Sequence, residues 1–272
     1  MTLFDQFKAS LAQQDAVLVT VQSHRGSVPR EAGAWMAVFA DHSIGTVGGG
    51  HLEWQAMQEA RARLQGAVGE PVLRFALGPS LGQCCGGEVH LLFERVSVAD
   101  LPALAQRFEQ QKAAWPLVAL FGGGHVGRAL VAVLGTLPLR MHWIDSRDEI
   151  FPTKLPAQVA CEHSQPVQAA VADLPTGAHV LIMSFSHAED LDVVAACLQR
   201  QRTQGDLPFI GLIGSRTKWA VFGQRLRARG FTDTEMAQVT CPIGLTGIHG
   251  KAPEVIAVAV AAQLLQVMHK ID

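Results

Sequence analysis

Two adjacent cysteines are the residues of this chain with the most distinctive chemistry. The segment LGQCCGGEVHLLFE, residues 81–94, places Cys84 and Cys85 before a Gly-Gly pair and an alternating strand pattern. Structural zinc sites use spaced pairs such as C-x-x-C, so neighbouring sulfurs suit one tetrahedral ion poorly. A thiolate is also a soft metal ligand and a carrier of persulfide sulfur. We predict that Cys85, and to a lesser degree Cys84, contacts a bound group; the alternative is that one or both fill a turn as small apolar side chains.

Two further loops in the first hundred residues carry groups that bind anions. One has the sequence RGSVPR, and the other is GTVGGG, directly before a predicted helix. The donor residues of these two loops are Arg25, Ser27, Arg30, Gly48, Gly49 and Gly50. Arginine forks and free backbone amides together bind phosphate or another polyanionic group. A tight turn would explain each loop alone, but three such loops favour a shared cofactor-binding site.

A glycine fingerprint marks the second half of the chain. Gly122, Gly124 and Gly127 fit G-x-G-x-x-G between an apolar strand and a helix. Asp145 ends the next predicted strand, about 20 residues on, where a carboxylate holds a ribose hydroxyl in dinucleotide-binding proteins. Arg147 would suit a 2′-phosphate, or it is a surface charge. The pattern predicts a Rossmann-like domain and leaves the binding of NAD(P) open.

Other polar side chains near these loops are weaker candidates. His125 lies inside the glycine loop, where it could meet a phosphate or another part of a bound group, or simply begin the helix. His187 follows a predicted strand, at the carboxyl edge where parallel sheets bind ligands. His51 and Glu53 are interpreted as polar residues of a first helical turn.

The elements that must hold these loops follow two different patterns. From about residue 113 onward, apolar strands alternate with helical segments, which predicts a parallel sheet with helices on both faces. Before residue 100, two helices and several strands predict an α+β arrangement with mixed strands. We therefore predict an α/β protein, with an N-terminal α+β domain over residues 1–100. A Rossmann-like, doubly wound domain with a C-terminal helix follows over residues 101–272.

Composition narrows the classes of function. The 272 residues are 49% hydrophobic and 17% charged, as in a well-buried globular protein. The net charge of −2 offers no electrostatic footprint for nucleic acid. The polar start and the interrupted apolar late segment predict neither a signal peptide nor a membrane span. The cysteine total of five, an odd number, indicates reduced thiols in the cytoplasm, and Cys161, Cys197 and Cys241 are interpreted as structural.

The motifs together resemble one known family. In order along the chain they are RGSVPREAGAWM, GTVGGGHLE, LGQCCGGEVHLLFE, FGGGHVGRAL, GLIGSRTKW and CPIGLTGIHGKAPEVIAVAVAAQLL. They resemble the XdhC/CoxI family, the accessory proteins of xanthine dehydrogenase and related molybdenum hydroxylases. The resemblance implies a chaperone that binds the molybdopterin form of the molybdenum cofactor and protects it. It further implies sulfuration with a cysteine desulfurase, delivery to apo-xanthine dehydrogenase and a homodimer, with Cys85 as a candidate molybdenum contact.

Two other classes of protein stay open on the sequence. The intact glycine fingerprint also fits an NAD(P)-dependent oxidoreductase, although a chain without tyrosine cannot contain a Tyr-x-x-x-Lys motif. A zinc or redox protein built on the cysteine pair is the other. Because no convincing acid–base pair is visible, an accessory protein without turnover is preferred over an enzyme.

Overall fold

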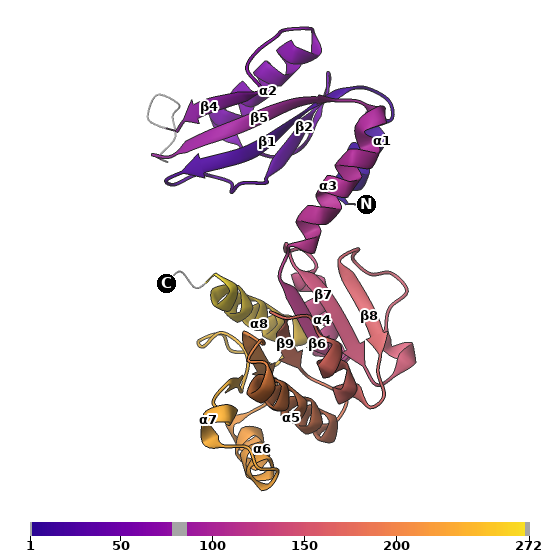
Figure 1. Ribbon diagram of the computed structural model, residues 1–272, viewed down its shortest axis with the longest axis vertical. Helices are drawn as coiled ribbons and strands as arrows, with labels where there is room; N and C mark the ends of the chain where they lie inside the picture. The colour runs from indigo at the N-terminus through magenta and orange to yellow at the C-terminus, as the bar shows by residue number, and fades with distance from the viewer. Residues whose placement is uncertain (1, 78–85, 270–272) are drawn as a thin grey trace. The chain divides into compact units, whose positions relative to one another are not determined.

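The computed structural model describes residues 2–77 and 86–269 and divides into two compact units (Figure 1). Unit 1 is Met1–Phe108 and unit 2 is Glu109–Asp272. The division falls within helix α3 (Leu101–Ala113), whereas the sequence pattern changes near residue 100. The reason is that Phe108 of α3 is buried in unit 1, where its ring lies 5.1 Å from that of Trp35.

Unit 1 is built on one five-stranded sheet with the order β3-β2-β1-β5-β4. The strands are β1 (Ala16–Arg25), β2 (Trp35–Val38), β3 (Ser43–Gly45), β4 (Val72–Ala76) and β5 (Glu88–Val96). The prediction of mixed strands is wrong for the described residues, because every pairing in this sheet is antiparallel. Helix α2 (Gly50–Leu64) does connect β3 to β4, but β4 pairs with β5 at the opposite edge rather than beside β3.

Helices cover both faces of this sheet. Val17, Val19 and Val21 of the central strand β1 lie in a core with residues of α2. Ala16 and Leu18, on the other face, lie in a core with residues of α1 (Leu3–Leu11) and α3. Burial on both faces explains why β1 begins as a nearly continuous apolar run.

Unit 2 contains a six-stranded sheet with the order β11-β10-β9-β6-β7-β8, and all its pairings are parallel. The strands are β6 (Leu117–Phe121), β7 (Arg140–Asp145), β8 (Val159–His163), β9 (His179–Ile182), β10 (Phe209–Leu212) and β11 (Val239–Thr240). Numbered within the unit, this is the order 3-2-1-4-5-6 of the Rossmann fold. The predicted parallel sheet is confirmed, and the strand order reverses between β6 and β9.

Helices also cover both faces of the second sheet. Helices α4 (His125–Leu134) and α8 (Pro253–Met268) share one apolar core with β6 and β7. Helices α5 (His187–Thr203) and α6 (Arg216–Ala228) share the core of the other face with a 3-10 segment, Val167–Asp173. The short helix α7 (Asp233–Met236) leads into the edge strand β11. This doubly wound arrangement places the glycine loop at the point where the strand order reverses.

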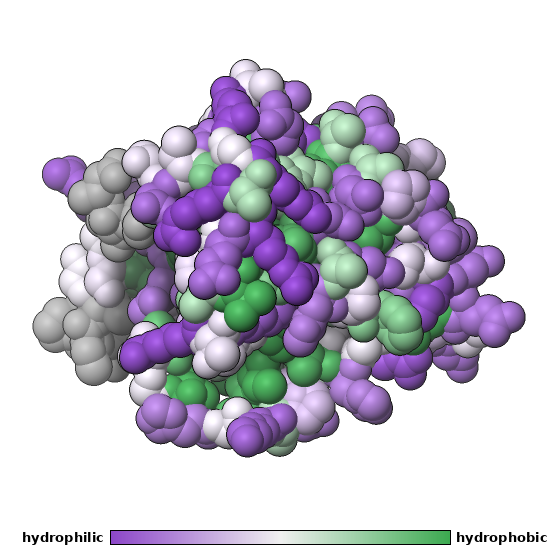
Figure 2. Space-filling model, turned by 90° about the horizontal axis from the view of Figure 1, so that it is seen from below, coloured by the Kyte–Doolittle hydropathy of each residue, from purple (hydrophilic) through white to green (hydrophobic). Residues whose placement is uncertain are grey.

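The face of the molecule seen in Figure 2 is largely polar. In the view of Figure 2, hydrophilic side chains cover most of the face and apolar side chains show between them in small groups. Among residues 2–77 and 86–269, none of the helices combines the length and the apolar character needed to cross a bilayer.

Candidate functional site

Two of the predicted loops of unit 1 meet where β1 ends and β5 begins. Gly87 packs so closely on the turn after β1 that a Cβ at Gly87 would overlap the carbonyl oxygen of Ser27. The same Cβ would lie 2.9 Å from the carbonyl oxygen of Arg25. On its other side, the Gly87 carbonyl accepts a hydrogen bond from the Leu77 amide at 2.8 Å. The two ends of the cysteine segment are therefore held together beside the RGSVPR loop.

The third loop joins the same edge through Gly48. This residue has a φ of +135°, and a Cβ on it would overlap the ring of Pro29. The RGSVPR loop thus lies between the GTVGGG loop and Gly86–Gly87. The structure brings the described parts of all three predicted loops together.

The two cysteines themselves lie outside the described residues. Cys84 and Cys85 immediately precede Gly86 in the sequence, and Gly86 and Gly87 are the first described residues after them. The site is therefore built below from the residues that surround this segment.

The place where the RGSVPR loop, the GTVGGG loop and Gly86–Gly87 meet, called the loop edge below, carries cationic groups. Arg25, Ser27 and Arg30 are all exposed. Among the described residues, no carboxylate lies within ion-pair distance of the guanidinium of Arg25 or Arg30. The two charges are consequently available to an anion in solvent.

The glycine amides of the GTVGGG loop are less available than the sequence suggests. The amides of Val47 and Gly49 donate to Oε2 of Glu53 at 3.2 and 3.1 Å. The Gly48 amide donates to Oγ1 of Thr46 at 3.1 Å, and that hydroxyl donates to Glu53 in turn. The expectation that Gly48 and Gly49 present free amides is therefore wrong. The carboxylate of Glu53 already accepts the hydrogen bonds that a bound anion would take, and it thereby anchors the loop.

An exposed aromatic pair follows this loop and was missed in the sequence. Trp54 is 52% exposed, and His51 stacks on it with ring centroids 5.5 Å apart and an interplanar angle of 23°. Both side chains come from the first two turns of α2. Their spacing of three residues, which places side chains on one helix face, is the signal that could have revealed the pair.

In unit 2, two glycines of the fingerprint serve packing. Gly122 has a φ of +122°, and a Cβ on it would overlap the carbonyl oxygen of Met183 after β9. A Cβ on Gly127 would overlap the carbonyl oxygen of Gly122. The first and third glycines therefore let β6, β9 and α4 approach one another, as expected for this fingerprint.

The second glycine faces open space. No atom lies within 4 Å of a Cβ built on Gly124, which precedes α4. Gly124 and the following His125 are both exposed. This is the point of the loop that a ligand can approach.

Asp145 has partners other than the ribose hydroxyl expected for it. Its side chain is 1% exposed and accepts from the amide of Gly123 at 2.6 Å. It also accepts from the amide of Arg147 at 2.9 Å and from the guanidinium Nε and Nη2 at 2.8 and 2.9 Å. Burial opposes ionisation of this carboxyl, but the bonds from Arg147 and Gly123 outweigh it and hold the pKa of Asp145 below its usual value.

The ends of β9 and β10 are joined by a buried ion pair. Lys218 Nζ lies 2.6 Å from Oδ2 of Asp190 and 2.8 Å from the carbonyl oxygen of Ile213. The other carboxylate oxygen of Asp190 accepts from the Ser184 amide at 2.7 Å. His187, the remaining candidate at this edge, is exposed and lies edge-on to the ring of Phe222. The cluster ties strand ends to helices and leaves His187 at the surface.

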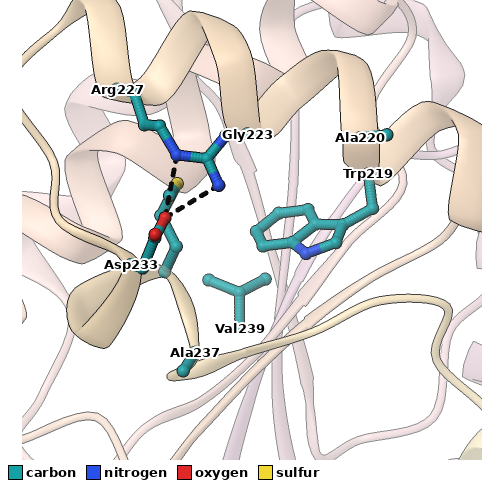
Figure 3. A pocket seen from close by; sticks show the side chains of 8 residues that line it. Trp219, Ala220, Gly223, Arg227, Asp233, Ala237 and Val239 are labelled. Atoms are coloured by element: carbon teal, nitrogen blue, oxygen red, sulfur yellow. Dashed lines mark hydrogen bonds and ion pairs between the residues drawn. The ribbon is translucent and has the colours of Figure 1, made fainter.

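A hollow of about 330 Å³ lies elsewhere on unit 2 (Figure 3). Its walls include Trp219 of α6, Val239 of β11 and the Arg227–Asp233 ion pair. None of the predicted site residues lines it, so it supports no assignment to the glycine loop.

The three described cysteines differ in accessibility. Cys197 is fully buried, and burial raises the pKa of its thiol to about 12. Cys241 is half-buried and Cys161 is exposed on β8. Outside the segment 78–85 and the chain ends, no three His, Cys, Asp or Glu side chains gather as a metal site would require. The burial of Cys197 is compatible with the structural role expected for it, whereas the exposed Cys161 gives that expectation no support.

An antiparallel α+β unit followed by a Rossmann unit defines the class of this protein. Residues 118–264 match the XdhC Rossmann domain, and residues 9–76 match the XdhC and CoxI family. The chain belongs to the XdhC family.

The chain is also similar to individual proteins. The Escherichia coli (strain K12) protein YqeB is 28% identical over 276 residues, which cover 98% of this chain and 46% of YqeB. The chain thus spans less than half the length of that relative. The crystal structure of a protein described as a xanthine dehydrogenase from Bacillus halodurans covers 100% of this chain, with 97% of its own length matched. Its TM-score is 0.75 at 18% identity, which shows a shared fold.

Proposed function

We propose that this protein is an accessory protein that binds the molybdenum cofactor, in its molybdopterin form, at the loop edge of unit 1. The observation that carries the proposal is the convergence of three loops around the exposed Arg25 and Arg30, neither of which forms an ion pair with a carboxylate of residues 2–77 or 86–269. Gly87, which follows the cysteine pair and Gly86 in the sequence, packs against the same edge. Membership of the XdhC family supports the same reading.

Each group at this edge suits one part of the cofactor. The guanidinium groups of Arg25 and Arg30 would hold its phosphate through charge-assisted hydrogen bonds, with Ser27 as a further donor. The thiolate of Cys85 would contact molybdenum, because a soft sulfur ligand suits this metal, and Cys84 would do so less directly. The chain itself has the role of holding the cofactor and needs no turnover of its own.

The family relation extends the proposal to partners. The protein would protect the cofactor, support its sulfuration by a cysteine desulfurase and insert it into xanthine dehydrogenase. It would act in the cytoplasm, as a homodimer. These steps require that the cofactor be released as well as bound, which an exposed loop edge permits more readily than an enclosed cavity.

Retention of the cofactor on a desalting column tests the proposal. Isolated molybdenum cofactor is mixed with the full-length protein, and pterin, phosphate and molybdenum are measured in the protein fraction. We expect retention by the wild type and a loss of about tenfold or more in Arg25→Gln/Arg30→Gln, since two charge-assisted hydrogen bonds are removed.

Arg95→Gln is the matched control. Arg95 is also a partly exposed arginine of unit 1, but it pairs with Asp15 at 3.3 Å and lies at the opposite end of β5 from Glu88. The Arg95→Gln variant should retain as much cofactor as the wild type. Equal retention by the wild type and by an unrelated Rossmann protein would contradict the proposal.

A further inference from the structure

The carboxyl end of β6 in unit 2 is where a sheet of this strand order binds a dinucleotide. In such sites the pyrophosphate lies on the glycine loop, and an acid at the end of the next strand accepts hydrogen bonds from the adenosine ribose. Asp145, at the end of β7, is the residue in that position. Its contacts therefore decide whether NAD(H) fits.

Asp145 has no acceptor position left for a ribose. An ionised carboxylate offers about four lone-pair positions. Oδ1 receives the amide and Nε of Arg147, and Oδ2 receives the amide of Gly123 and Nη2 of Arg147. All four contacts lie between 2.6 and 2.9 Å, and the side chain is 1% exposed. A ribose hydroxyl would have to displace the arginine fork.

The space in front of Asp145 is also bridged by side chains. Strand β6 lies between β7 and β9 in the sheet, so contacts between the loops after β7 and β9 cross its end. The Arg147 guanidinium lies 4.3 Å from the ring centroid of Phe185, which is 64% exposed. Ser146 Oγ donates to Oε1 of Glu189 at 2.7 Å. These two contacts join the loops on either side of the end of β6, which is where sheets of this strand order hold the adenosine of a dinucleotide.

We propose that the Asp145–Arg147 pair closes the glycine loop of unit 2 to NAD(H). Arg147 acts as the residue that determines specificity: it saturates the ribose acceptor and bridges the adenosine crevice to Phe185. Asp145 serves to hold the glycine loop through Gly123. This proposal is independent of cofactor binding at the loop edge of unit 1, and it argues against an NAD-dependent oxidoreductase.

Calorimetric titration of the full-length protein with NADH tests the proposal. The wild type should bind with a Kd weaker than about 1 mM. Arg147→Met removes the fork but keeps an unbranched stem, and it returns two acceptor positions to Asp145. We expect its affinity for NADH to rise at least about tenfold, the scale of one hydrogen bond to a charged group.

Arg128→Met is the matched control, because Arg128 also reaches the glycine loop but donates to the carbonyl oxygens of Gly123 and Ile150. It should bind NADH as weakly as the wild type. Arg147→Lys keeps a cation without a bidentate fork and serves if Arg147→Met does not fold; its affinity should rise about threefold or more. A wild-type Kd tighter than about 1 mM, or no gain in a folded Arg147 variant, would overturn the proposal.

Discussion

Gly87 lies against the carbonyl oxygen of Ser27 so closely that no side chain fits between them. This contact joins the residue pair that follows the two cysteines to the loop that carries Arg25 and Arg30. The proposed cofactor edge depends on it, because it fixes Gly87, two residues after Cys85 in the sequence, beside the loop that carries the two exposed guanidinium groups.

Gly87→Ala should therefore destabilise unit 1. The added methyl group meets backbone atoms of Ser27 and Arg25, which cannot rotate away, so we expect a loss of about 1–3 kcal/mol in the free energy of unfolding. Gly86→Ala is the control, since nothing lies within 4 Å of its Cβ, and it should change stability by less than about 0.5 kcal/mol. Urea denaturation measures both; equal stabilities would mean that the contact is not close.

Glu53→Ala should loosen the GTVGGG loop. The substitution leaves the amides of Val47 and Gly49 without their acceptor, which costs about 1–3 kcal/mol. Glu59→Ala, on the same helix, removes only an ion pair with Arg63 and should cost under about 1 kcal/mol. A Glu53 variant as stable as the Glu59 variant would show that the carboxylate does not anchor the loop.

Substitutions at two fingerprint glycines should have different effects, one on the stability of the fold and the other on anion binding. Gly122→Ala combines a φ of +122° with overlap on Met183 and should cost more than about 3 kcal/mol. Gly124→Asp, which points into open space, should leave the fold intact and weaken any anion bound at the loop by charge repulsion. Thermal unfolding measures the stability of both variants, and titration with phosphate or nucleotide measures anion binding. Unchanged binding of every anion by Gly124→Asp would mean that the glycine loop has a structural role alone.

The regular architecture could be predicted from the sequence, but the partners of individual side chains could not. The alternation of strands and helices after residue 113 is a local pattern, so the parallel sheet follows from it. The antiparallel pairing of β4 with β5 instead depends on where a helical connection delivers the chain. Glycine and arginine mark the three unit 1 loops in the sequence, so their positions could be predicted, but the use of the GTVGGG amides by Glu53 could not.

Two site residues show most clearly what could not be predicted from the sequence. The sequence predicts Glu53 to be an ordinary first-turn residue, because no sequence pattern shows that its carboxylate accepts hydrogen bonds from three groups of the preceding loop. Asp145 matched the dinucleotide pattern in spacing, but its saturation by Gly123 and Arg147 depends on groups 22 and two residues away meeting at one point. Contacts of this kind determine which side-chain and backbone groups are free to bind a ligand, and they produce no periodic pattern in the sequence.

Stability should depend on pH through Asp145. The folded pKa lies below the ordinary value of 3.8, so the stabilisation is present above that pH and is lost as pH falls through the folded pKa. Asp145→Asn should cost about 3 kcal/mol at pH 7, because a buried pair is broken. The difference in the free energy of unfolding between the wild type and Asp145→Asn should become smaller once the pH falls below 3.8. A gap that stays constant from pH 7 to about pH 3 would contradict the assigned contacts.

The most direct test of the account is activation of apo-xanthine dehydrogenase at equal bound cofactor with a cysteine desulfurase present. Cys85→Ala should fold normally and activate the dehydrogenase much less than the wild type, and Cys84→Ala should be affected less, because consecutive side chains point in different directions. Cys161→Ala, which removes an exposed thiol of unit 2, should activate fully. Full activation by Cys85→Ala would contradict the central claim and return both cysteines to the role of small packing residues.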